Sequence, residues 1–156
     1  MPIDVVIQLM ERDEFLAMKN SFNLSNEFRQ KLHSYVECHK NFLGAEDSDF
    51  RHAIFFAHEQ GSCQGVAFHY FYVKLSTGQC ELFGLFVEPQ YRSKGLGAEL
   101  LAKALDLSVS LGVTFVSISL TGKNSSTGKL VANFLRKTQK YRPVVQFRVI
   151  ADDKYL

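Results

Sequence analysis

The stretch from Glu81 to Ala98 constrains the fold more than any other part of this 156-residue chain. It combines an apolar β-rich run, a turn with Pro89, a loop with Gly95 and Gly97, and the start of an amphipathic helical pattern. A helix that opens after such a loop exposes its first amides at the positive end of its dipole, which makes an anion site. The two glycines lack the Cβ atoms that would hold a phosphate away from the backbone.

Two cations, Arg92 and Lys94, lie beside these glycines, so the pattern Arg92-x-x-Gly95-x-Gly97 predicts a cradle for a pyrophosphate. Other phosphate motifs fit less well. The dinucleotide fingerprint needs a third glycine where this chain has Leu100, and a Walker loop ends in Gly-Lys-Ser/Thr, which this sequence lacks. The alternative is that the loop serves only as a structural helix cap.

Hydrophobic periodicity predicts a mixed α/β fold of one domain over residues 1–156. Short turns should join the strands Arg51–His58, Gly65–Leu75 and Gln79–Val87 into an antiparallel meander. A helix at Gly95–Leu111 and a strand at Val113–Leu120 then complete a parallel β-α-β crossover. Further strands are expected at Ile3–Leu9 and Val144–Ile150. Further helices are expected at Glu11–Asn20, from Ser25 to about Phe42, and from Ser125 or Thr127 to Tyr141. The sheet would thus be flanked by about four helices.

At these residues the chain resembles the GNAT superfamily of N-acetyltransferases. The family signature is Arg/Gln-x-x-Gly-x-Gly/Ala after a strand that ends in apolar-Val-x-Pro-x-Tyr-Arg, and here it runs from Leu85 to Gly97. The order of elements agrees over most of the chain, whereas the N-terminal third matches only in outline. The resemblance implies the GNAT fold. It also implies transfer of an acetyl group from acetyl-CoA to a primary amine of a small molecule or peptide, by direct attack in a ternary complex.

The resemblance further implies where acetyl-CoA binds. The cofactor would lie in a V-shaped opening between the strands Gln79–Val87 and Val113–Leu120, with its thioester carbonyl pointing at an amide near Phe86. Asn124 matches a common cofactor-contacting position. The pantetheine arm would pair with Leu85, Phe86 and Val87, and the pyrophosphate would sit on the amides of Arg92, Ser93, Lys94, Gly95, Leu96, Gly97 and Ala98.

An amine must lose a proton before it attacks a thioester, so the reaction needs a base. Glu81 is the candidate, because many members of the family place a glutamate at this point of the strand. Alternation predicts that its side chain shares a face with Phe83, Leu85 and Val87. An ordinary solvated glutamate at a strand end is the alternative. His69 is a second candidate, although a histidine on a strand is more often structural.

The family often uses a tyrosine on its last helix to protonate the departing thiolate. The matching position here is Arg136, Val131 or Leu135, depending on the alignment, and none of these is tyrosine. One alternative is that thiolate release needs no protein acid, since a thiol pKa is about 8.5. Another hydroxyl, such as that of Tyr141, is a second possibility. The third is a catalytically weak GNAT-fold module that binds acyl-CoA as a regulator.

The composition limits the kinds of partner that this chain is expected to bind. A net charge of +2, with basic residues spread along the chain, does not predict nucleic-acid binding. No run approaches the roughly 20 apolar residues that span a bilayer. Cys38, Cys63 and Cys80 have no metal-ligand spacing and are expected to be buried free thiols. With no signal peptide evident, we expect a cytoplasmic protein without a metal, and the resemblance suggests a homodimer.

Overall fold

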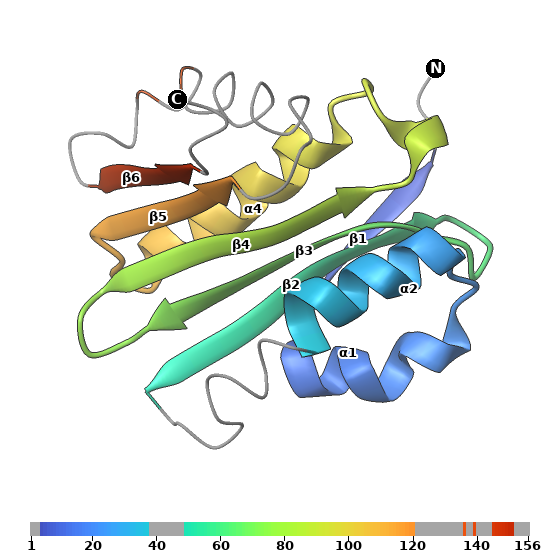
Figure 1. The fold of residues 1–156 in the computed structure, drawn as a ribbon, viewed down its shortest axis with the longest axis horizontal. Helices are drawn as coiled ribbons and strands as arrows, with labels where there is room; N and C mark the ends of the chain where they lie inside the picture. Colours follow the sequence, from blue (N-terminus) through green and yellow to red (C-terminus); the bar gives the residue numbers. More distant parts are fainter. Residues whose placement is uncertain (1–3, 38–48, 121–135, 137–138, 140–144, 152–156) are drawn as a thin grey trace.

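The computed structural model describes residues 4–37, 49–120, 136, 139 and 145–151 (Figure 1). The strands are β1 Val5–Glu11, β2 Phe50–Glu59, β3 Gly65–Lys74, β4 Gln79–Val87, β5 Phe115–Leu120 and β6 Gln146–Ala151. The α-helices are α1 Arg12–Met18, α2 Asn26–Leu32 and α4 Leu96–Ser110. Short helical segments follow α1 and α2, at η1 Lys19–Ser21 and at the π-helical turn η2 His33–Glu37, and a third, η3 Pro89–Tyr91, follows β4.

All six strands form one sheet in chain order. The pairs from β1 to β4 are antiparallel, and β4 pairs with β5, and β5 with β6, in parallel. The predicted meander and crossover are therefore confirmed, and so is the mixed α/β fold class. The helix expected from Ser125 or Thr127 to Tyr141 lies outside the described residues, as does the part of the second expected helix beyond Glu37.

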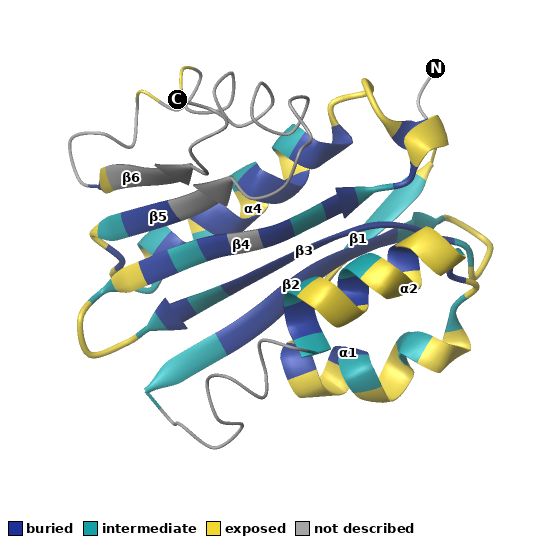
Figure 2. Cartoon of the chain, viewed as in Figure 1, coloured by how far each residue is buried: buried dark blue, intermediate teal, exposed yellow. Residues whose placement is uncertain are grey.

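A hydrophobic core lies on each face of the sheet (Figure 2). The helix α4 covers one face, where the predicted apolar stripe that includes Leu100, Leu101 and Leu105 is buried. The helices α1 and α2 cover the other face through Phe15, Phe28, Leu32 and other apolar side chains. We call these the α4 face and the α1/α2 face, and they decide below which side chains can meet.

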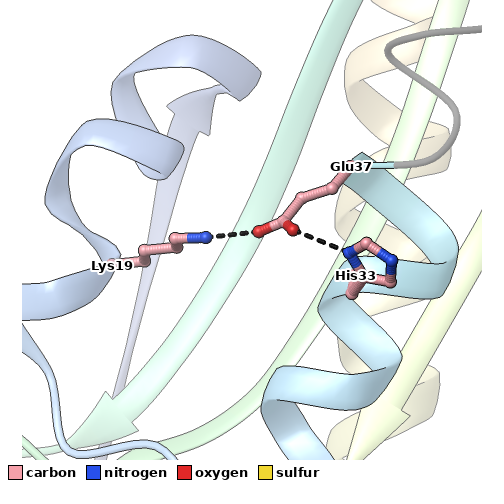
Figure 3. A network of polar contacts seen from close by, with 3 residues as sticks. All are labelled: Lys19, His33 and Glu37. Carbon is pink, nitrogen blue, oxygen red and sulfur yellow. Dashed lines mark hydrogen bonds and ion pairs between the residues drawn. The ribbon is translucent and has the colours of Figure 1, made fainter.

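A carboxylate links the two helices of the α1/α2 face (Figure 3). Glu37 on η2 accepts a hydrogen bond from the ammonium of Lys19 on η1. Its second oxygen lies 3.0 Å from Nδ1 of His33, one turn earlier on the chain. Burial raises the pKa of Glu37, but the hydrogen bonds from Lys19 and His33 outweigh it, and the net pKa is lowered.

Of the two described cysteines, only one is buried as expected. Cys80 is a buried free thiol whose sulfur lies 3.2 Å from the Ser108 hydroxyl, and burial raises its pKa to about 12. Cys63 is also free but exposed, because it follows the Gly61 turn between β2 and β3, so the expectation of burial is wrong there.

Candidate functional site

The strand β4 is bulged at the point where it separates from β5. Tyr70 of β3 pairs with Gly84 and Phe71 pairs with Leu82, so Phe83 is an extra residue with no partner on β3. The last parallel pair between β4 and β5 is Leu82 with Ile118. Beyond it β4 continues past the end of β5, as Figure 1 shows. This is the arrangement that the predicted V-shaped opening requires.

Hydrogen bonding shows which backbone groups of β4 point toward β3 and which point away from it. The amide of Glu88, just after β4, donates to the carbonyl of Val66 on β3 at 2.9 Å. Polar backbone groups alternate in direction along a strand, so Phe86 also directs its amide to β3, whereas Leu85 and Val87 direct theirs away. In agreement, the outward carbonyl of Val87 accepts a hydrogen bond from Nε of Arg92 at 2.8 Å.

The loop after β4 leads into α4 through two left-handed residues, Ser93 (φ 65°) and Gly95 (φ 83°). Among the described residues, a Cβ atom at Gly95 would meet nothing within 4 Å, so this part of the structure leaves the space above the glycine open. The first amides of the 15-residue helix α4 follow directly and have no intrahelical acceptors. The backbone therefore forms an open concave turn at a helix N-terminus, which suits an anionic group.

The two cations of this loop are held by aromatic rings. The guanidinium of Arg92 lies 5.9 Å from the ring centre of Phe86, and the ammonium of Lys94 lies 5.9 Å from that of Tyr91. Arg92 also approaches Glu27 on α2, with its Nη2 3.9 Å from a carboxylate oxygen. Both side chains thus stay beside the loop as the sequence predicts.

The predicted base, Glu81, is half-buried on β4 and lies two residues before the bulge. Its pairing partner on the neighbouring strand β3 is Tyr72, which packs against the core of the α1/α2 face. Leu85 and Val87 pack against the opposite core. The prediction that Glu81 shares their face is therefore wrong, because the bulge at Phe83 reverses the alternation.

Tyr72 is the residue of β3 that pairs with Glu81. Burial raises the pKa of the Tyr72 hydroxyl to about 12, and the negative charge of Glu81 contributes to the shift. The phenol therefore stays neutral near pH 7 and can donate a hydrogen bond. The position of Tyr72 opposite Glu81 depends on strand register, which local sequence pattern does not reveal.

His69, the second candidate base, lies elsewhere. Its ring stacks on Phe71 at 5.8 Å on the α4 face, so it lies across the sheet from Glu81. Its Nδ1 is buried without a hydrogen-bond partner among the described residues, and burial lowers its pKa to about 3. A base with so low a pKa is poorly matched to catalysis near pH 7, so the structural interpretation of His69 is the better one.

A separate polar cleft of about 320 Å³ opens on the α1/α2 side of the sheet, where α1 begins and β2 starts. It contains none of the predicted site residues. Its wall includes His52, whose Nδ1 lies 2.6 Å from the buried hydroxyl of Tyr70. It is lined by Glu11, Arg12, Asp13, Phe50, Arg51, His52 and Leu75.

Glu81 thus lies on β4, and the glycine-rich loop follows the same strand on the way to α4. Asn124 and the side chain of Phe83 lie outside the described residues. Within the described part of the chain, no group of three or more His, Cys, Asp or Glu residues could hold a metal ion. None of the described helices has the length and apolar character that crossing a bilayer requires.

This architecture is that of an acetyltransferase fold, as several solved structures show. The aminoglycoside N-acetyltransferase AAC(6')-Iy in complex with CoA matches with a TM-score of 0.59 at 16% identity, over 86% of this chain and 88% of that one. The ribosomal-protein-S18-alanine N-acetyltransferase of Escherichia coli matches with a TM-score of 0.56 at 21% identity, over 83% and 75%. An aminoglycoside acetyltransferase from an uncultured soil metagenomic sample matches with a TM-score of 0.56 at 13% identity, over 85% and 90%.

A match in sequence shows which family the chain belongs to. Residues 15–129 match the model of the Acetyltransferase (GNAT) family, which is more than half of the chain, and the chain belongs to that family. Among curated proteins, none matches the chain in sequence.

Proposed function

We propose that this protein is an N-acetyltransferase that moves the acetyl group of acetyl-CoA to a primary amine of a small molecule or peptide. The observation that carries the proposal is the separation of β4 from β5 at the bulge, with outward backbone groups on β4 and an open helix N-terminus beyond them. One side of this opening suits a chain of amides such as pantetheine, and its far end suits a pyrophosphate.

The donor would be held mainly by backbone. Leu85 and Val87 would pair with the pantetheine arm as with an added strand, with Phe86 between them packed into the core. The amides from Arg92 to Ala98 would hold the pyrophosphate, with Arg92 and Lys94 supplying positive charge. The amide of Leu85, which alternation directs into the opening, is better placed than that of Phe86 to donate to the thioester carbonyl.

The acceptor amine would lie on the α1/α2 face, because Glu81 directs its carboxylate there. Glu81 would take a proton from the ammonium, directly or through a water molecule. The neutral nitrogen would then attack the thioester carbon, forming the C–N bond. The developing oxyanion would be stabilised by the Leu85 amide. The attached nitrogen would lose its second proton as collapse breaks the C–S bond, and CoA would leave as a thiolate that takes up that proton, directly or through a water molecule.

A panel of amines tests this function through the release of free CoA thiol. Small-molecule amines, diamines and peptides with a free N-terminus or lysine would each be mixed with acetyl-CoA and the purified protein. Thiol release that depends on one class of amine, with the acetylated product seen by mass spectrometry, would support the proposal. Tight acetyl-CoA binding with no amine-dependent release from any class would instead indicate a binding module.

A further inference from the structure

The helix α2 and its continuation η2 contact β4 and the residue after it, in the part of the strand that follows its last pair with β5. At one end, the Ser25 hydroxyl that caps α2 donates to the carboxylate of Glu88, which is only 5% exposed. Further along, the rings of Phe28 and Phe86 meet edge to face at 5.4 Å. At the other end, η2 brings a tyrosine onto the backbone immediately after the bulge.

That last contact joins Tyr35 to Gly84, and it is unusually close. A Cβ atom at position 84 would lie 2.6 Å from Cβ of Tyr35 and 2.9 Å from its Cγ and Cδ2. Real Cβ atoms essentially never come so close, so only glycine fits beneath this side chain. The atoms involved are those next to the backbone of Tyr35, which cannot swing aside as a side-chain tip can.

The ring of Tyr35 is also held by its other neighbours. The ammonium of Lys31 lies over it, 5.6 Å from the ring centre, and the Phe68 ring is 6.3 Å away. Tyr35 is therefore a half-buried ring fixed between α2, β3 and β4. A ring in this position restrains the backbone on which it rests.

We propose that Tyr35 is a positioning residue for acetyl transfer: its ring, packed on Gly84, fixes the peptide group whose N–H belongs to Leu85. Gly84 supplies the carbonyl of that peptide group, and it lies between the bulge and the first residue whose amide faces the opening. Gly84 also pairs with Tyr70 on β3, which holds the carbonyl side of this peptide group, and the Tyr35 side chain packs directly onto Gly84. The inference rests on the proposed function, in which the Leu85 amide donates to the thioester carbonyl.

The role assigned to Tyr35 belongs to its ring and not to its hydroxyl. Tyr35→Phe keeps the ring on Gly84 and should behave as wild type. Tyr35→Ala removes the ring, and Gly84→Ala forces it away. Both should lower kcat by about 10²-fold, since a displacement of about 1 Å at a reacting group can cost that much. Acetyl-CoA affinity should stay within about threefold, because most of the donor is held elsewhere.

Gly65→Ala is the matched control. It also adds a methyl group at a tight site, 2.4 Å from Cδ2 of Leu24, but at the start of β3 and away from the bulge. Each variant would be assayed for kcat, acetyl-CoA affinity and thermal unfolding. The assay would use the best amine of the panel, at a temperature where all variants are folded. Gly65→Ala should keep the wild-type kcat even where its melting temperature falls.

A second measurement does not need an acceptor. The amide proton shift of Leu85, observed by NMR, should differ between the complexes with acetyl-CoA and with CoA, because only the thioester offers the carbonyl. We expect this difference in wild type, Tyr35→Phe and Gly65→Ala, and its loss in Gly84→Ala and Tyr35→Ala. A difference that survives in Gly84→Ala would overturn the positioning role, as would a Tyr35→Phe variant as impaired as Tyr35→Ala.

The experiments distinguish a failure of the proposed function from a failure of the positioning role of Tyr35. Wild type that binds acetyl-CoA and shows the Leu85 shift, yet acetylates no amine, would contradict the proposed function and leave the positioning role supported. Wild type that acetylates an amine while Gly84→Ala turns over as fast as Gly65→Ala would contradict the positioning role alone.

Discussion

Glu81 and Leu85 lie on either side of the bulge residue Phe83, and the chemistry assigned to them differs. One offers a carboxylate to the α1/α2 face, and the other an amide to the opening between the strands. We predict that Glu81→Gln lowers kcat by about 10²–10⁴-fold near neutral pH, because the amine then lacks its proton acceptor. Stopped assays of thiol release, with acetyl-CoA affinity from calorimetry, measure both effects.

Acetyl-CoA affinity should stay close to normal in Glu81→Gln, because none of the proposed donor contacts involves this side chain. Glu99→Gln is a suitable control, since Glu99 is exposed on α4. A Glu81→Gln protein that keeps full activity at every pH would remove Glu81 from the role of base.

At the residue scale, local pattern predicts which residues form the candidate site but not the face of the sheet on which they lie. The loop from Arg92 to Ala98 and the glutamate on β4 follow from local pattern. The face of Glu81 does not, since a bulge is a property of strand pairing and no single strand reveals it. The contact between Tyr35 and Gly84 joins residues far apart in the chain, so it too was out of reach; a glycine inside a β-rich run was its only signal.

At the scale of elements, the start of α4 carries the strongest prediction about binding. Gly97 is buried in the first turn of α4, and Gly97→Trp would add an indole next to the proposed pyrophosphate position, so it should abolish acetyl-CoA binding. The far-UV circular dichroism spectrum should stay that of the folded protein. Lys103→Trp, at an exposed position on the same helix, should bind normally. Unchanged affinity in Gly97→Trp would show that the cradle is elsewhere.

The contact between η1 and η2 predicts how stability depends on pH. The pKa of Glu37 in the folded protein lies below its ordinary value of 4.5, so the ionised carboxylate stabilises the fold above that pH. This stabilisation is lost as pH falls through the lowered pKa. Glu37→Gln should therefore be less stable than wild type at pH 7, by up to about 1 kcal/mol, and the difference should shrink below pH 4.5.

Thermal unfolding between pH 7 and pH 3 measures this difference. Glu14→Gln, at an exposed position on α1, provides the comparison and should show little change in stability. A destabilisation of Glu37→Gln that stays constant over the whole range would mean that the ionised carboxylate does not act through Lys19 and His33.

Most elements could be predicted because their signals are local. The bounds of β4 agree with the prediction, and those of β3 and α4 differ by at most one residue at each end. At the N-terminus, β1 runs from Val5 to Glu11 and not from Ile3 to Leu9, because its bounds follow the pairing with β2, which the apolar pattern of one strand does not encode. The division of α2 into an α-helix and a π-helical turn depends on hydrogen bonding that propensity does not encode.

At the scale of the whole molecule, the sheet has β1 at one described edge and β6 at the other. We propose a homodimer, since a sheet edge can pair with a second copy. Light scattering at high protein concentration should then give twice the mass of the 17.7 kDa chain. A monomer mass at every concentration would contradict the dimer and leave the site unaffected.

Calorimetric titration of the folded protein with acetyl-CoA tests whether the proposed opening beside β4 binds this donor. NAD and ATP serve as controls, because each carries a pyrophosphate but lacks the pantetheine arm that β4 would hold. We predict a micromolar dissociation constant for acetyl-CoA and much weaker binding of the other two. No binding of acetyl-CoA, or equal binding of all three, would show that the proposed donor site is wrong.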